Sequence, residues 1–120
     1  MQIQQIISDP VAIDLWEENM HEPWADYIGA DMFVVRDKGE IVGGFAVYRD
    51  DSDGVKGLFC SGWAKHGAHV PTGQILKQLA SSVGDVYFKT DKRTAKILLE
   101  RIGEKVKTAS GFGYYIIKGA

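Results

Sequence analysis

The apolar positions of this chain follow two different spacings, one typical of helices and one typical of strands. Apolar side chains that recur every three or four residues predict helices over 10–20, over 71–82 and from a cap at Thr90 or Asp91 to Gly103. Shorter apolar runs bounded by turn residues predict strands over 2–7, 31–36, 40–49, 55–64, 85–89, 105–109 and 114–118. A further short helix is expected after Glu22-Pro23-Trp24.

Local signals mark where several of these elements begin and end. Asp9 followed by Pro10 is typical of a helix start, because Asp caps the first turn and proline fits its first position. Residues 37–39 (DKG) have tight-turn chemistry, and 50–54 (DDSDG) predict a second, polar turn. The pair Gly43-Gly44 within a strand indicates a bulge or the close approach of another backbone.

The order of these elements predicts a mixed α/β fold in one domain over residues 1–120. An antiparallel meander occupies the middle of the chain, and a strand–helix–strand–helix unit and a C-terminal hairpin follow it. A chain of 120 residues is long enough to bury a single core.

Composition excludes some classes of protein and favours a reducing compartment. We expect neither an export signal nor a membrane span, because the N-terminus lacks a basic region and no apolar run reaches roughly 18 residues. The one cysteine, Cys60, can form no internal disulfide, which favours the cytoplasm. Its apolar surroundings (GLFCSG) predict a buried small hydrophobe rather than a nucleophile.

The charge is distributed unevenly along the chain. Residues 1–54 hold twelve acidic and three basic side chains, a net charge of −9, whereas residues 86–120 hold eight basic and three acidic ones, a net charge of +5. A cationic ligand would therefore favour the N-terminal half and an anionic ligand the C-terminal half. The alternative is a solvated mixed-charge surface. Nucleic acid is not an expected partner, because no stacking motif accompanies the basic residues.

Three segments resemble the GNAT superfamily, the GCN5-related N-acetyltransferases. The pair MFVVRDKGEIVGGFAVYR resembles a strand pair of that family, GQILKQL resembles the start of its cofactor helix, and TAKILLERIG resembles its later helix. The resemblance runs over nearly the whole chain and implies a GNAT-like fold that binds acetyl-coenzyme A.

The resemblance also assigns residues to the cofactor. The backbone of Phe59, Cys60 and Ser61 would pair with the pantetheine arm, and the N–H groups of Thr72, Gly73 and Gln74 would face the pyrophosphate. On this assignment, the substitution Gly73→Glu places a carboxylate against the pyrophosphate and abolishes binding.

The chain departs from the family's motifs at several positions. Of the phosphate turn only Gly73 remains, and Pro71 has no N–H to donate. Leu99 stands where the family's Tyr protonates the departing thiolate, so another group or water must do so. Our candidates for catalysis are His66, which is also a candidate base for the acceptor amine, and Tyr114; Cys60 and Tyr87 are the other titratable groups nearby.

Two further groups of residues are candidates for ligand sites, the loop histidines and the large aromatic side chains. His66 and His69 are three residues apart without a third ligand at a suitable spacing, so no metal site is expected. Several aromatic residues are candidates for an acceptor pocket, although the core also needs them, and Trp24 is expected to be exposed: Trp16, Trp24, Tyr27, Phe45 and Trp63.

Two functions remain open at this point. The first is an N-acyltransferase that moves an acetyl group from acetyl-coenzyme A to an amine on a small molecule or protein. The second is a non-catalytic GNAT-fold module, because the chain is similar to short GNAT-like proteins of tailed phages. Such a module would act in head assembly, in the virion or in another interaction, and a homodimer is a further candidate assembly.

Overall fold

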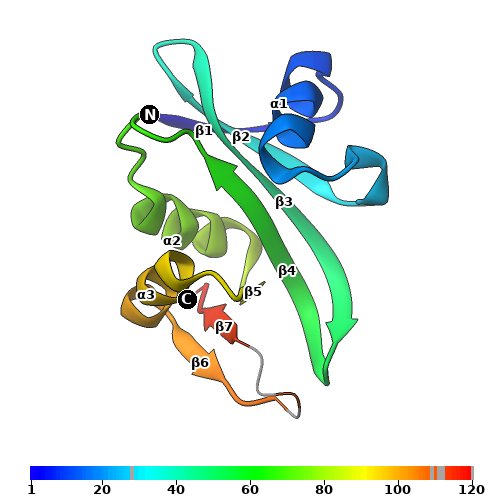
Figure 1. Ribbon diagram of the computed structural model, residues 1–120, viewed down its shortest axis with the longest axis vertical. Helices are drawn as coiled ribbons and strands as arrows, with labels where there is room; N and C mark the ends of the chain where they lie inside the picture. The colour runs from blue at the N-terminus through cyan, green and yellow to red at the C-terminus, as the bar shows by residue number, and fades with distance from the viewer. Residues whose placement is uncertain (28, 109, 111–112, 120) are drawn as a thin grey trace. The chain divides into compact units, whose positions relative to one another are not determined.

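The computed structural model describes residues 1–27, 29–108, 110 and 113–119 (Figure 1). Among these residues, hydrogen bonds join the strands in the order β1-β2-β3-β4-β5-β7-β6, which makes a seven-stranded sheet. The residues group into two compact units, which we describe separately. The N-terminal unit holds residues 1–48 and 61–70, and the C-terminal unit holds residues 49–60 and 71–120.

The N-terminal unit is an antiparallel sheet covered by one helix. Its elements are β1 (Gln2–Ile6), α1 (Pro10–Met20), the short 3-10 helix η1 (Trp24–Asp26), β2 (Asp31–Asp37), β3 (Glu40–Ser52) as far as Tyr48, and the end of β4 (Val55–Ala64) from Ser61. Strands β1 and β2 pair antiparallel with Gln4 opposite Val34, and β2 pairs antiparallel with β3. The predicted helix over 10–20 and the first hairpin are confirmed.

Helix α1 begins as the sequence predicts and packs on the sheet. The Asp9 carboxylate accepts hydrogen bonds from the backbone N–H groups of Val11 and Ala12, and Pro10 occupies the first turn. One face of the helix buries Ala12 and Trp16 against the core of this unit, which also contains Met32, Val34, Ile41 and Ala46. Burial of this apolar face supplies most of the helix's stability, since its own propensity is modest.

The expected glycine irregularity in β3 is confirmed. The β2–β3 register shifts between Val35 and Arg36, where Val35 pairs with Gly43 and Arg36 with Ile41. A Cβ on Gly44 would lie 2.7 Å from Nε1 of Trp63, so only glycine leaves room for that indole. The glycine therefore allows Trp63 of β4 to lie against the β3 backbone.

The C-terminal unit contains the strand–helix–strand–helix segment and the final hairpin. Its further elements are α2 (Thr72–Val83), β5 (Val86–Lys89), α3 (Arg93–Ile102), β6 (Glu104–Val106) and β7 (Tyr114–Ile117). Strand β4 pairs parallel with β5 through Phe59 and Tyr87, and β7 pairs antiparallel with both β5 and β6. The mixed α/β class and the C-terminal hairpin are confirmed; of the predicted strand 105–109, Ala109 lies outside the described residues.

Several predicted boundaries in this unit were wrong. The strand predicted over 105–109 begins at Glu104 and ends at Val106. The polar turn is shorter than residues 50–54, because β3 continues to Ser52 and the turn is made by Asp53 and Gly54, whose φ values are 55° and 80°. Neither Thr90 nor Asp91 caps α3: the cap position is Lys92, and the Thr90 hydroxyl accepts a hydrogen bond from the N–H of Lys92 instead. Gly103 does end the helix, and its N–H donates to the carbonyl of Leu99.

Candidate functional site

The first turn of α2 presents backbone N–H groups at a positive helix end. The first hydrogen bond of this helix joins the Ile75 N–H to the Pro71 carbonyl over 3.1 Å, so the amides of Gly73 and Gln74 precede the helical ladder. The N-cap residue Pro71 makes no side-chain capping hydrogen bond, and the first turn holds no acidic residue. Gln74 is exposed, whereas Thr72 and Gly73 are half-buried. This arrangement suits an anion such as a diphosphate.

Gly73 faces α3, which the sequence did not indicate. A Cβ on Gly73 would lie 3.5 Å from Cδ1 of Leu98 and 3.5 Å from Cγ2 of Ile102. A glutamate side chain at this position would therefore start out between two apolar residues, not toward an anion at the helix end. Gly73→Glu would therefore alter the packing of α2 on α3 as well as the charge of the first turn, and its effect on cofactor binding stays a prediction.

The β4 segment assigned to the pantetheine arm has buried side chains. Phe59 and Cys60 are buried, Ser61 is half-buried, and the rings of Phe59 and Tyr87 lie 5.6 Å apart. Burial raises the pKa of the Cys60 thiol far above its ordinary value, so the thiol keeps its proton. The expectation of a buried small hydrophobe is confirmed, and any contact of this segment with a cofactor must use its backbone.

The C-terminal unit holds one of the two catalytic candidates. Tyr114 is buried, and its Oη lies 2.7 Å from Oγ of Ser52, while Nζ of Lys89 lies 5.8 Å from its ring centroid. Leu99, at the position of the family's Tyr, is buried in α3 and offers no proton. Tyr114 therefore has a hydroxyl that already belongs to a hydrogen bond in the core.

The other candidate, His66, lies in the N-terminal unit on the exposed segment after β4. His66 and His69 are both exposed, and His69 adopts a φ of 52°. Within the described ranges, no three His, Cys, Asp or Glu side chains come together as a metal site would require.

A cluster of hydroxyl groups in the N-terminal unit was not predicted from the sequence. The Tyr27 hydroxyl donates to Oε2 of Glu22 over 2.9 Å, and Oη of Tyr48 lies 2.9 Å from Oγ of Ser61. Burial, then the hydrogen bond to Glu22, raises the pKa of Tyr27 well above its ordinary value, although a hydrogen bond with Ser61 opposes the rise. Tyr27 is thus a protonated donor, and only the fold brings these residues together.

Aromatic rings of η1 and α1 pack next to this cluster. Trp24 was expected to be exposed, but it is half-buried: it stacks on Tyr27 at 5.7 Å and meets the edge of Trp16 at 5.2 Å. The expectation was wrong because the backbone N–H of Trp24 donates to Glu17 over 2.8 Å, which holds η1 against α1. Trp16 and Phe45 are core residues.

Comparison with known proteins identifies the class of fold. No protein-family model matches the chain, and no curated protein matches it by sequence. Solved structures do match over nearly the full length of both chains, and those described below are acetyltransferases. The chain has the fold of the GNAT N-acetyltransferases. Among the described residues, no helix is both long and apolar enough to span a membrane.

Three of these structures illustrate the match. Campylobacter jejuni N-acetyltransferase PseH has a TM-score of 0.66 and 11% identity, with 99% of this chain and 98% of that chain covered. Bacillus subtilis N-acetyltransferase YlbP, in complex with coenzyme A, has a TM-score of 0.67 and 12% identity, with 98% and 95% covered. Aminoglycoside acetyltransferase AAC(6')-Ib, in complex with coenzyme A and kanamycin, has a TM-score of 0.63 and 13% identity, with 98% and 95% covered.

Proposed function

We propose that the protein is an N-acetyltransferase that uses acetyl-coenzyme A and an amine acceptor. One observation carries this proposal: the α2 N-terminus, which begins at Pro71 without a side-chain cap from that residue and holds no acidic residue in its first turn, occurs in a fold whose neighbours YlbP and AAC(6')-Ib were crystallised with coenzyme A. In this proposal the first turn of α2 receives the pyrophosphate through the amides of Gly73 and Gln74, and the backbone of Phe59, Cys60 and Ser61 lies along the pantetheine arm.

The reaction itself needs two proton movements. The amine nitrogen attacks the thioester carbonyl, the C–S bond breaks, the thiolate takes up a proton, and the amine loses one. The side chain of Leu99 can neither donate nor accept a proton. Each candidate is tested by itself: if His66 is the base, His66→Ala should lower kcat more than it changes the affinity for coenzyme A, and if Tyr114 is the acid, the same should hold for Tyr114→Phe.

The proposed binding of coenzyme A can be tested by a substitution at one exposed position of α2. Gln74→Glu adds a negative charge to the first turn, which favours the helix dipole in the free protein but repels a diphosphate. We expect the free variant to melt at an equal or higher temperature, while its affinity for coenzyme A falls roughly tenfold, or about 1.4 kcal/mol. Isothermal calorimetry and thermal melts measure the two effects.

Gln78→Glu is the matched control for this experiment. Gln78 is also exposed, one turn further along α2, and the same charge is added. The affinity of this variant for coenzyme A should stay within about twofold of the parent, because the dipole effect is confined to the first turn. Equal losses in both variants would contradict the assigned site. Absence of any binding by the parent at millimolar coenzyme A would refute the enzyme and leave a non-catalytic module.

A further inference from the structure

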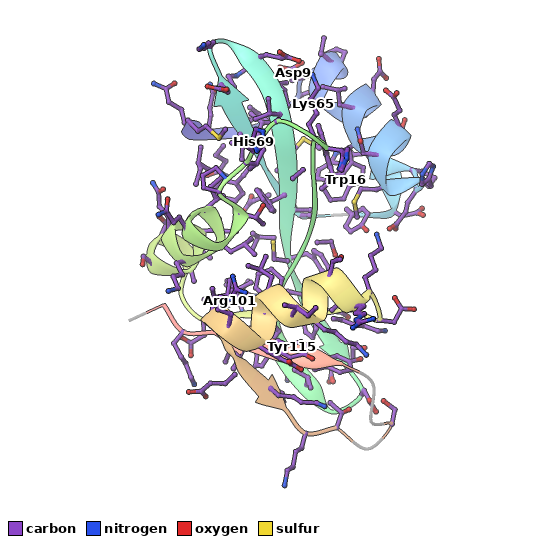
Figure 2. All side chains as sticks on the ribbon, turned by 60° about the vertical axis from the view of Figure 1, so that its left-hand side comes forward. Asp9, Trp16, Lys65, His69, Arg101 and Tyr115 are labelled. Carbon is purple, nitrogen blue, oxygen red and sulfur yellow. The ribbon has the colours of Figure 1, made fainter. Side chains whose placement is uncertain are left out.

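A cavity of about 450 Å³ lies in the N-terminal unit, beside α1. Its walls come from one side of α1, from the β2–β3 hairpin and from the end of β4. Asp9 directly precedes α1 and Lys65 directly follows β4; both are labelled in Figure 2. The volume falls in the range of sites for small molecules.

The basic residues of this cavity already have acidic or carbonyl partners. Nζ of Lys65 lies 2.6 Å from Oε1 of Glu40. The Arg36 guanidinium donates to the Gly39 carbonyl and lies 3.7 Å from the Asp9 carboxylate. An incoming anion would therefore have to compete with groups of the chain itself for both cations.

On the α1 side of the cavity, the acidic residues have no basic residue in their own helical turn. Glu18 lines the cavity from the last turn of α1, and that turn carries Glu17 as well but no basic residue. The C-terminal end of a helix is itself negative and favours cations. The carboxylates of this turn and the helix end therefore both favour a cation at this side of the cavity.

The rest of the wall is largely apolar. Leu15 and Trp63 are half-buried, Ile41 is buried, and Val11 keeps 61% of its surface exposed at the rim. Such a wall gains free energy by covering the apolar part of a ligand. Since Glu18 and Asn19 follow Leu15 by three and four positions, they lie on the same side of α1 as the apolar residues.

We propose that this cavity binds a small amphipathic amine, with its ammonium group at Glu18 and its apolar body against Leu15 and Trp63. The proposal goes beyond the acetyltransferase function, and it requires no coenzyme A. The two proposals can therefore fail independently of each other.

Three probes of similar size test the charge preference on the full chain without cofactor. They are 2-phenylethylamine, the neutral 2-phenylethanol and the anionic 3-phenylpropionate, titrated at low ionic strength and followed by NMR chemical shifts, including that of the Trp63 indole N–H. The amine should bind at least roughly tenfold more tightly than the alcohol, and the anion should bind least. Nuclear Overhauser contacts between the phenyl protons and the Trp63 indole should identify the cavity.

Two substitutions on α1 make the test specific to Glu18. Glu18→Gln should weaken amine binding roughly tenfold and leave alcohol binding unchanged. Asp14→Asn removes a charge from an exposed position of the same helix that does not line the cavity, and it should change binding by less than about twofold. Binding of the anion in preference to the amine, equal effects of the two substitutions, or no contact with Trp63 would each overturn the proposal.

Discussion

Gly73 of α2 and Ile102 of α3 face each other, so that a methyl group on Gly73 would lie 3.5 Å from Cγ2 of Ile102. This distance is ordinary van der Waals contact, and the φ of Gly73 is not in the left-handed region. Gly73→Ala should therefore stabilise the protein by about 0.5–1 kcal/mol, because alanine restricts the unfolded chain. Urea unfolding measures the gain.

The same substitution separates packing from binding. Alanine keeps the backbone N–H, so coenzyme A affinity should be unchanged if the amides hold the pyrophosphate. Gly73→Ile is the contrasting variant, because its extra carbons would collide with Leu98 and Ile102. A stabilised Gly73→Ala protein that no longer binds coenzyme A would show that the glycine itself, not its N–H, is required.

Asp9 should contribute to stability mainly as a helix cap. Its carboxylate accepts from the N–H groups of Val11 and Ala12 and lies 3.7 Å from the Arg36 guanidinium. Asp9→Ala removes both interactions and should cost about 1 kcal/mol, whereas Asp9→Asn keeps the cap and should cost only a few tenths. Guanidinium unfolding distinguishes them; equal losses would assign the stability to the ion pair instead.

Tyr114 should reveal whether its hydroxyl is structural or catalytic. Tyr114→Phe breaks the hydrogen bond to Ser52 and should cost about 1 kcal/mol of stability, as should Ser52→Ala. A proton donor acts only through its own hydroxyl, so kcat should fall in Tyr114→Phe and persist in Ser52→Ala. Equal kcat in the two variants would remove Tyr114 from the chemistry.

Cys60 should make the protein less stable in mildly alkaline solution. Burial raises the pKa of this thiol in the folded protein above its ordinary value of 9.0, so the unfolded chain releases this proton first as pH rises. The contribution of this thiol to the free energy of unfolding is therefore complete below pH 9.0. Above pH 9.0 the free energy of unfolding falls, by up to about 1.4 kcal/mol per pH unit.

Cys60→Ala isolates that contribution. The variant has a smaller side chain and will be less stable at every pH, so the slope of stability against pH is the informative quantity. Its slope above pH 9.0 should be shallower than that of the parent. Identical slopes would show that other groups, such as the tyrosines, account for the alkaline loss.

Much of the architecture could be predicted because its signals are local. The carboxylate of Asp9, the proline after it and the apolar spacing of residues 10–20 lie within one segment, and together they determine α1. Gly44 also indicated a close approach, although it did not show that Trp63 was the side chain involved. The α2 N-terminus was likewise predicted from the amphipathic pattern that follows Pro71.

The sequence by itself therefore determined the order of elements, the start of α1, the end of α3 at Gly103 and the absence of a glutamate or aspartate near the start of α2. Only the tertiary structure decided which way Gly73 faces, that Tyr48 meets Ser61, and that Glu18 and Trp63 line one cavity. The physical reason is the separation along the sequence over which each kind of interaction acts. Capping and periodicity act within a few residues, whereas these contacts depend on sheet register and on how a helix packs, which the whole chain sets together.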